Sequence, residues 1–171
     1  MATRDAAAAA RALEDVGAAE GKLPDGTTPL HAAAMGGDPK CINLVLNAAL
    51  DPAALLEEAA TNGMTAAMIA AAAGKAGALE TLLRRGADAD ARHAFANTTA
   101  LHMAAENGFE ETVRILCEAG ADADARSALG GAPVHAAAQR GHSKAAAALL
   151  ADPCAADGNA LLNGDSTPLY L

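Results

Sequence analysis

Three histidines that recur at one place in the sequence are the residues best suited to bind a metal ion or to transfer a proton. His31, His102 and His135 each follow a short stretch that begins with threonine or alanine and ends with leucine or valine. Imidazole is a common metal ligand, but the sequence lacks the closely spaced cysteine and histidine pairs of protein metal sites. We therefore interpret these histidines as architectural residues, hydrogen-bonded at the starts of helices, and we expect no metal and no cofactor.

The serines and cysteines do not form a recognisable nucleophilic site. No nucleophile elbow or oxyanion loop adjoins any of the serines, which are Ser127, Ser143 and Ser166. The cysteines are odd in number, far apart and without a Cys-x-x-Cys pair, which indicates free thiols in a reducing compartment; they are Cys41, Cys117 and Cys154. We expect no catalytic residue and predict that the chain is not an enzyme.

Acidic residues dominate the charge of the chain. Two aspartate pairs, Asp88 with Asp90 and Asp122 with Asp124, lack the loop patterns of calcium-binding proteins, so we interpret them as parts of solvated turns. The formal net charge is −9 and only 2% of the 171 residues are aromatic. Because negative charge repels phosphate and few side chains could stack on bases, we expect no nucleic acid partner. We also expect no membrane insertion, because the apolar run over 66–73 is far shorter than the roughly 20 residues that a spanning helix needs.

The elements that must position these residues repeat along the chain. The tetrapeptide Thr28-Pro29-Leu30-His31 has counterparts at residues 65–68, 99–102, 132–135 and 167–170, spaced by 37, 34, 33 and 35 residues. A second stretch keeps the same period, since residues 86–92 and 120–126 both read GADADAR. Two landmarks with one period indicate that the chain is an array of copies of one unit.

The third copy predicts the structure of a unit. Thr99 can accept a hydrogen bond at a helix start, a short helix follows over 100–106, and Gly108 ends it. A second helix over about 110–119 has apolar residues three and four positions apart, and a glycine-containing turn links it to the next copy. Paired alanines in the first helices allow close approach, so we expect larger side chains of the second helices to dominate the core: Leu44, Leu46, Leu82, Leu83, Ile115, Leu116, Leu149 and Leu150.

These residues resemble the ankyrin repeat family. The resemblance rests on the glycine-x-TPLH-x-alanine-alanine frame and on the GADAD sequence after the second helix, and it covers residues 25–171. It implies an all-α, ankyrin-type helix-turn-helix repeat solenoid with β-turn or hairpin connections. We expect an N-terminal capping helix within 1–24, repeats over 25–61, 62–96, 97–130 and 131–163, and the start of a truncated fifth repeat over 164–171.

The sequence departs from the family pattern at three places. Met68 replaces the histidine of the second copy, so we predict that this repeat is the least rigid. Extra residues around 55–61 predict an additional helical turn in the first connection. The final copy stops soon after its helix-start signal, which suggests a continuation beyond Leu171.

The resemblance implies a protein interaction module, a scaffold or adaptor that binds another protein on its concave face. Charge favours a partner with a basic surface. The alternatives are a regulatory or targeting segment of a longer enzyme or channel, and a structural spacer within a larger assembly. We expect a monomer unless the exposed C-terminal end pairs, and a cytoplasmic location with the nucleus as alternative.

Two sets of residues follow from this interpretation. The helix-start residues are Thr28, His31, Thr99, His102 and His135. The expected contact residues lie at the exposed ends of first helices and on the turn tips: Met35, Ala72, Ala73, His93, Phe95, Glu106, Asn107, Leu129, Gln139 and Arg140.

Overall fold

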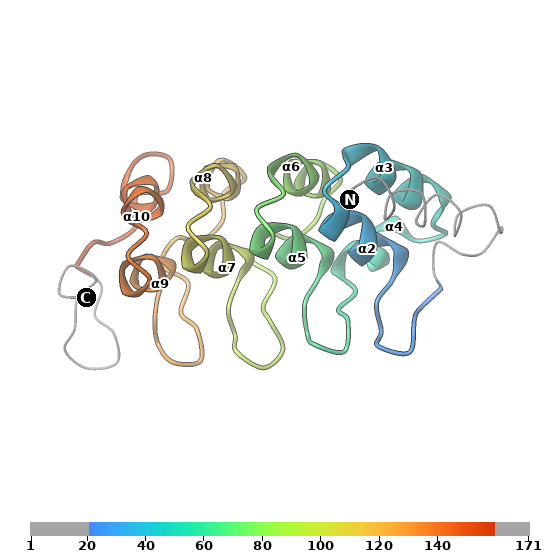
Figure 1. Cartoon of the computed structure of the whole chain (residues 1–171), viewed down its shortest axis with the longest axis horizontal. Helices are drawn as coiled ribbons and strands as arrows, with labels where there is room; N and C mark the ends of the chain where they lie inside the picture. Colours follow the sequence, from blue (N-terminus) through green and yellow to red (C-terminus); the bar gives the residue numbers. More distant parts are fainter. Residues whose placement is uncertain (1–20, 160–171) are drawn as a thin grey trace. The chain divides into compact units, whose positions relative to one another are not determined.

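The computed structural model describes residues 21–159, which form nine α-helices and no β-strand (Figure 1). Of the predicted N-terminal cap over 1–24, only residues 21–24 are described, and they belong to the turn before α2. The predicted start of a fifth repeat over 164–171 lies outside the described residues. The chain divides into two compact units, residues 1–88 and 89–171, which we call unit 1 and unit 2.

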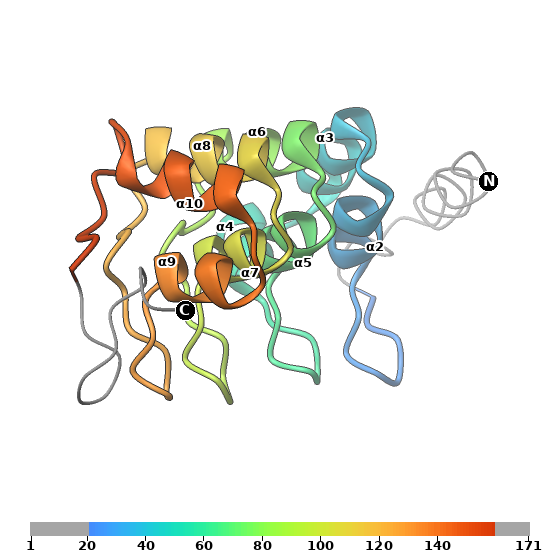
Figure 2. The same cartoon turned by 60° about the vertical axis from the view of Figure 1, so that its left-hand side comes forward.

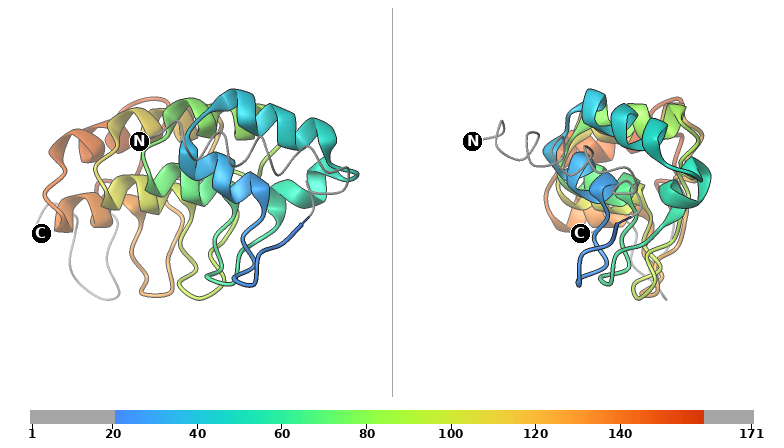
Figure 3. Two further views of the ribbon diagram at one scale, coloured as in Figure 1. Left: turned by 45° about the vertical axis from the view of Figure 1, so that its right-hand side comes forward. Right: turned by 90° about the vertical axis from the view of Figure 1, so that its right-hand side faces the viewer.

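Unit 1 contains two helix pairs and one additional helix. The helices are α2 (Pro29–Gly36), α3 (Pro39–Ala48), α4 (Pro52–Glu57), α5 (Ala66–Ala72) and α6 (Ala76–Arg84). Helix α2 packs against α3 and α5, and α6 packs against α5 and α3. The first helices α2 and α5 thus form one layer and the second helices α3 and α6 the other, while the loops before α2 and α5 project beyond the first layer (Figures 1 and 3).

Unit 2 repeats this arrangement with two helix pairs. Its helices are α7 (Ala100–Glu106), α8 (Glu110–Glu118), α9 (Pro133–Gln139) and α10 (Ser143–Leu150). Helix α7 packs against α8 and α9, and α10 packs against α8 and α9 (Figure 2). The first helix of the third copy begins and ends where the sequence predicts, and the second ends one residue earlier.

Side-chain caps explain where α3 and α4 begin. The Asp38 and Asp51 carboxylates accept the backbone N–H groups of Lys40 and Ala54, and a proline follows each aspartate as the first helical residue. Proline has no N–H to leave unpaired in that position and its fixed φ suits the helix. The cap at Asp51 starts α4, the additional helix, which begins three residues before the stretch in which the sequence predicted an extra turn.

The cores of both units combine alanines and larger apolar side chains of the first helices with apolar side chains, leucines among them, of the second helices. Leu46, Leu82, Leu116 and Leu149 are completely buried, as the sequence predicts. The other half of the predicted core set was placed wrongly: Leu44 and Leu150 are 55% and 42% exposed, and Leu83 and Ile115 are half-buried. Each of these four residues is one or two positions from a buried leucine, and a step of one residue turns the side chain about 100° around the helix axis.

Two glycines after first helices admit a side chain from the next helix pair. Gly37 and Gly108 both have positive φ, at 82° and 73°. A Cβ atom added to Gly37 would lie 2.7 Å from Cδ of Lys75, and one added to Gly108 would lie 2.6 Å from Nδ1 of His142. Glycine is therefore required at these positions both by the backbone conformation and by the closeness of the neighbouring pair.

Substitutions of two leucines on α3 test the core assignment. We expect Leu46→Ala to lower the free energy of unfolding by about 2–5 kcal/mol, because it leaves a cavity among buried side chains. Leu44→Ala should change it by about 0.5 kcal/mol or less, because that side chain is already largely in water. Urea unfolding followed by circular dichroism measures both values, and equal losses would contradict the assignment.

A second pair of variants tests the glycine contact. We expect Gly108→Ala to destabilise the chain by about 1–3 kcal/mol, since alanine strains the left-handed backbone and displaces the His142 ring. Gly36→Ala is the control, because Gly36 ends α2 with nothing within 4 Å of an added Cβ. The control should be neutral or slightly stabilising in the same urea experiment. A Gly108→Ala chain as stable as wild type would show that the contact is unimportant.

Candidate functional site

Unit 2 contains a groove between its two first helices and the loop that precedes α9. The groove has a volume of about 490 Å³ and is open to solvent. We call it the α7–α9 groove. Its lining residues come from the start and inner side of α7, from the loop before α9, and from α9 and its end: Thr98, His102, Glu106, Ser127, Leu129, Gly131, Ala132, His135, Ala136, Gln139 and Arg140.

The floor of the groove is fixed by hydrogen bonds of His102. Its Nδ1 accepts the backbone N–H of Thr99 at 3.2 Å and lies 3.0 Å from the Thr99 hydroxyl oxygen. Because Nδ1 accepts a hydrogen bond, the ring carries its own hydrogen on Nε2, which donates to the carbonyl oxygen of Gly131 at 3.0 Å. The imidazole thereby joins the start of α7 to the loop of the next helix pair.

The same arrangement occurs in unit 1. Nδ1 of His31 accepts the Thr28 backbone N–H at 3.1 Å, and Nε2 donates to the Met64 carbonyl oxygen at 3.1 Å. At the third histidine, His135, Nδ1 accepts the Ala132 N–H at 3.2 Å, but alanine supplies no hydroxyl. All three histidines are at most 4% exposed. The geometry agrees with the helix-start role expected from the sequence.

Met68 occupies the corresponding place in α5 and is completely buried. Its backbone N–H lies 3.4 Å from the Thr65 hydroxyl oxygen that would accept it, so the threonine half of the cap remains. A thioether cannot donate a hydrogen bond to a carbonyl oxygen, so packing replaces the polar link here. The lower rigidity expected of this repeat stays a prediction.

The rim of the groove carries an ion pair between Arg140 and Glu106, which joins the ends of α9 and α7. Both side chains are about half exposed or more. Water and salt screen such a pair, so its contribution to stability is about 1 kcal/mol or less. The Arg140 and Glu106 side chains can therefore leave each other and pair with charged groups of another molecule at a small cost in free energy.

Two hairpin loops of unit 2 present large apolar side chains to solvent. Phe95 is 74% exposed and Leu129, which occupies the same place one period later, is 80% exposed. The backbone N–H of Ala128 donates to the Ala96 carbonyl oxygen at 2.9 Å, which ties the two loops together. His93 shapes the first loop, because its Nδ1 accepts the Ala96 N–H at 3.1 Å and its ring meets Phe95 edge-on, with ring centroids 5.7 Å apart.

The structure brings together four of the ten contact residues expected from the sequence. Glu106, Leu129, Gln139 and Arg140 line the α7–α9 groove. His93 and Phe95 lie on the neighbouring hairpin and Asn107 turns back to donate to the Met103 carbonyl oxygen of its own helix, so these three do not line it. The remaining three belong to unit 1, where Met35 and Ala73 are exposed and Ala72 is half-buried.

Sequence reasoning missed groove residues that bear no conspicuous side chain. Thr98 and Gly131 directly precede the residues that cap the two first helices, and Ser127 occupies the place of His93 one period later. Equivalence of position within the repeat was the signal that could have found them. Their small size gave no chemical reason to select them.

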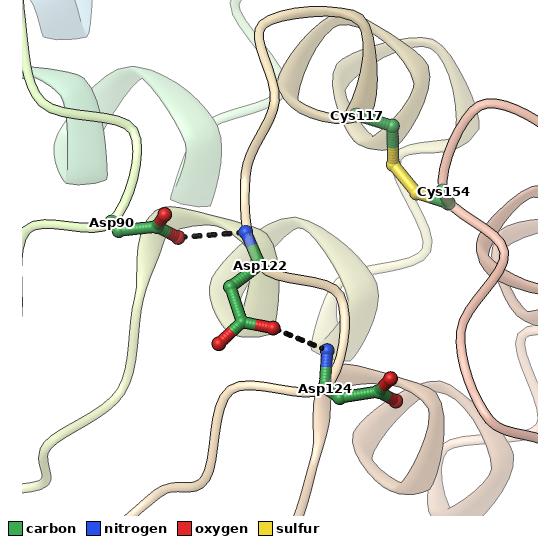
Figure 4. Close-up of a disulfide and its surroundings, with 5 residues drawn as sticks. All are labelled: Asp90, Cys117, Asp122, Asp124 and Cys154. Atoms are coloured by element: carbon green, nitrogen blue, oxygen red, sulfur yellow. Dashed lines mark hydrogen bonds between the residues drawn. A yellow bond between two sulfur atoms is a disulfide. The ribbon is translucent and has the colours of Figure 1, made fainter.

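The expectation of three free thiols was wrong for two cysteines. Cys117, near the end of α8, and Cys154, in the turn after α10, form a disulfide with their Cα atoms 4.9 Å apart (Figure 4). Cys41 is free and buried, and burial together with the nearby Asp38 raises the pKa of its thiol. Residues 37 positions apart gave no sequence signal of pairing, because their proximity is produced by the stacking of α8 and α10.

The aspartates interpreted as solvated turn residues also hold successive helix pairs together. A carboxylate oxygen of Asp90 accepts the Asp122 backbone N–H at 2.8 Å (Figure 4). A carboxylate oxygen of Asp124 accepts the Asp157 backbone N–H at 2.9 Å. Glu57 does the same for Asp88 in unit 1. In the described part of the chain, no group of three or more His, Cys, Asp or Glu side chains could hold a metal ion.

Comparison with protein families agrees with the geometry. A family model described as ankyrin repeats (3 copies) matches residues 5–93 and 78–161. The chain belongs to the ankyrin repeat family. Ankyrin repeats are in general protein–protein interaction modules, and the fold is typically non-enzymatic. Comparison with curated proteins finds no match. Within residues 21–159, none of the helices is long and apolar enough to cross a bilayer.

The bridging histidines of this ankyrin repeat protein have a defined charge state. Burial lowers the pKa of His31 and His102 from 6.5, since it disfavours the imidazolium form, although hydrogen bonds to the Met64 and Gly131 carbonyls oppose this. An imidazolium would also need to donate from Nδ1, which faces a backbone N–H. The folded chain therefore favours the neutral form of both rings more than the unfolded chain does.

We expect acid to destabilise the chain before its carboxylates are protonated. Below about pH 6.5 the unfolded chain binds protons on His31 and His102 that the folded chain does not. The free energy of unfolding then falls with pH, by at most about 1.4 kcal/mol per pH unit for each histidine, and above pH 6.5 these residues cause no pH dependence. Urea unfolding at a series of pH values measures the slope.

The variant His31→Gln/His102→Gln is the control for this slope. It should be less stable at neutral pH, but its stability should vary less with pH in the window below pH 6.5. Asp25 changes the stability only at lower pH, because hydrogen bonds from the Thr27 backbone N–H and hydroxyl lower the pKa of its carboxyl below 3.8. An unchanged slope in the variant would contradict the assignment.

Proposed function

We propose that this ankyrin repeat protein is a non-enzymatic scaffold or adaptor that binds another protein in the α7–α9 groove. The observation that supports this most directly is the exposed Leu129 at the edge of a groove whose other wall carries polar and charged groups. A large apolar side chain in water gains free energy when a partner covers it. Family membership supports protein binding in general.

The groove offers distinct chemistry along its length. Leu129 supplies an apolar edge, Gln139 an amide, and Glu106 with Arg140 a charge pair that a partner's charged side chains can replace. The net charge of −9 attracts a partner with a basic surface and accelerates their encounter at low salt. We therefore propose a partner segment with an aliphatic or aromatic residue near a lysine or arginine.

Phe95 extends the proposed contact surface to the neighbouring hairpin. It lies at the tip of the loop that is tied to the Leu129 loop, and its ring is packed only edge-on by His93. Aromatic side chains dominate many interfaces because they bury a large area with little loss of conformational freedom. In unit 1 we propose Met35, Ala72 and Ala73 as contacts of that unit's own first helices.

The repeats, the oligomeric state and the location of the chain follow the expectations from the sequence. We propose repeats over 25–61, 62–96, 97–130 and 131–163, each ending with the turn that precedes the next pair. We also propose a monomer in the cytoplasm. A disulfide in a cytoplasmic protein is usually transient, so this location implies that the bond between Cys117 and Cys154 forms and breaks.

Matched leucine variants test the groove. A partner obtained by cross-linking to the full chain is titrated against wild type, Leu129→Ala and Leu50→Ala. Leu50 is 91% exposed and lies in unit 1, outside the groove. We expect Leu129→Ala to weaken binding about tenfold or more, as removal of an interface anchor does, and Leu50→Ala to have no effect.

Charge and aromatic variants complete this test. Glu106→Lys and Phe95→Ala should each weaken binding, and wild-type association should slow as salt is added. If Leu129→Ala, Glu106→Lys and Phe95→Ala all bind as wild type, the groove is not the site. Cross-links confined to α8 and α10 would then favour a structural spacer that is contacted on its second helices.

A further inference from the structure

The turn after α10 departs from the pattern that the other second helices follow. After α6 and α8, the backbone N–H five residues beyond a buried leucine returns to that leucine's carbonyl oxygen, from Ala87 to Leu82 and from Ala121 to Leu116. After α10 the equivalent bond runs from Ala156 to Leu149, seven residues apart. Two additional residues have therefore been inserted into this turn, which reads Ala-Asp-Pro-Cys-Ala over 151–155.

The inserted turn places Cys154 beside Cys117, and the residues after it return to the positions that their counterparts occupy in the preceding repeat. The backbone N–H of Asp157 donates to the Asp124 carboxylate, just as the N–H of Asp122 donates to the Asp90 carboxylate one repeat earlier. The Cα atoms of the two cysteines are 4.9 Å apart, within the range that a disulfide spans. The departure from the repeat thus coincides with the appearance of a cysteine opposite another cysteine.

We propose that Cys117 and Cys154 are a reversible thiol–disulfide exchange site that fastens residues 151–159 to α8. The exchange partner is a small disulfide of the glutathione type. This site lies on the second helices and does not depend on what the α7–α9 groove binds.

The two cysteines differ in accessibility, which orders the exchange. Cys154 is half-buried, whereas Cys117 is 5% exposed. The Cys154 thiolate attacks one sulfur of glutathione disulfide, which forms a mixed disulfide and releases one glutathione thiolate. The Cys117 thiolate then attacks the Cys154 sulfur and releases the second. The protein loses two electrons and two protons, and the glutathione disulfide becomes two thiols.

The third cysteine is protected from this exchange. Cys41 is 7% exposed and lies in unit 1, and its Sγ is 3.7 Å from a carboxylate oxygen of Asp38. Burial raises the pKa of its thiol, which makes the reactive thiolate scarce. The chain therefore contains one reactive pair and one inert thiol, and the latter is a natural internal control.

Oxidation of the pair controls a second, apolar hollow of unit 2. This hollow has a volume of about 270 Å³, and its lining includes Val134, Ala146, Leu150 and Gly158. A Cβ added to Gly158 would lie 3.2 Å from Cδ2 of Leu150, so the fastened segment closes tightly on the end of α10. In the reduced chain this wall loses its covalent tie to α8, and we expect it to open more often.

The experiment equilibrates the full chain in buffers with a range of ratios of reduced to oxidised glutathione. Thiols are then trapped by alkylation and located by mass spectrometry. We expect a Cys117–Cys154 cross-link that appears and disappears reversibly with the ratio, while Cys41 is never cross-linked. Amide exchange in residues 151–159 should be about 10- to 100-fold slower in the oxidised chain, because the bond restricts opening of the segment.

Two serine variants make the result decisive. Cys154→Ser should abolish both the cross-link and the redox dependence of amide exchange, whereas Cys41→Ser should leave both unchanged. Failure of the cross-link to form at every glutathione ratio would overturn the proposal. So would a cross-link whose reduction leaves amide exchange in residues 151–159 unchanged. Loss of partner binding in the groove variants does not enter this test.

Discussion

The hydrogen bonds of His31 and His102 join one helix pair to the next within each unit. One ring nitrogen accepts a backbone N–H at the start of its own helix, and the other donates to a carbonyl oxygen at the entrance of the following pair. The first bond is buried and the second is partly buried, so exchanging either for a bond to water carries a loss. A neutral imidazole is well suited to this position because it is a donor and an acceptor on opposite sides of a flat ring.

Hydrogen bonds among the loops and turns also join successive helix pairs within each unit. Carboxylates accept the backbone N–H of a residue in the next turn, and in unit 2 the carbonyl oxygen of Arg126 accepts from the side chains of Arg92 and Asn97. These bonds lie between successive helix pairs, in the way expected of a protein whose stability comes from nearest-neighbour contacts. The α7–α9 groove lies between two of the first helices joined in this way.

The features particular to this protein are positions at which one repeat differs from the others. Phe95 and Leu129 put large apolar groups on two hairpins, whereas Asn62 occupies the equivalent position in the preceding hairpin. The insertion after α10 brings Cys154 against Cys117 of α8. In α5, the buried Met68 replaces the hydrogen-bonding histidine of the other first helices. Each departure is local, because regular bonds resume within a few residues, as at Asp157. Because each repeat of a solenoid contacts only its neighbours, one repeat can differ locally while the rest of the array keeps its structure.

The sequence by itself determined the helix pairs, their family and the role of the histidines, because these depend on caps, glycines and a period that are written in adjacent residues. It also indicated Glu106, Leu129, Gln139 and Arg140 as surface residues, since their positions within the repeat are equivalent or neighbouring. Only the tertiary structure decided which leucine of a pair is buried, that the Asp90 carboxylate reaches the next turn, and that Cys117 meets Cys154. Those outcomes depend on the rotation of each helix and on distances between residues more than thirty positions apart, which no local pattern encodes.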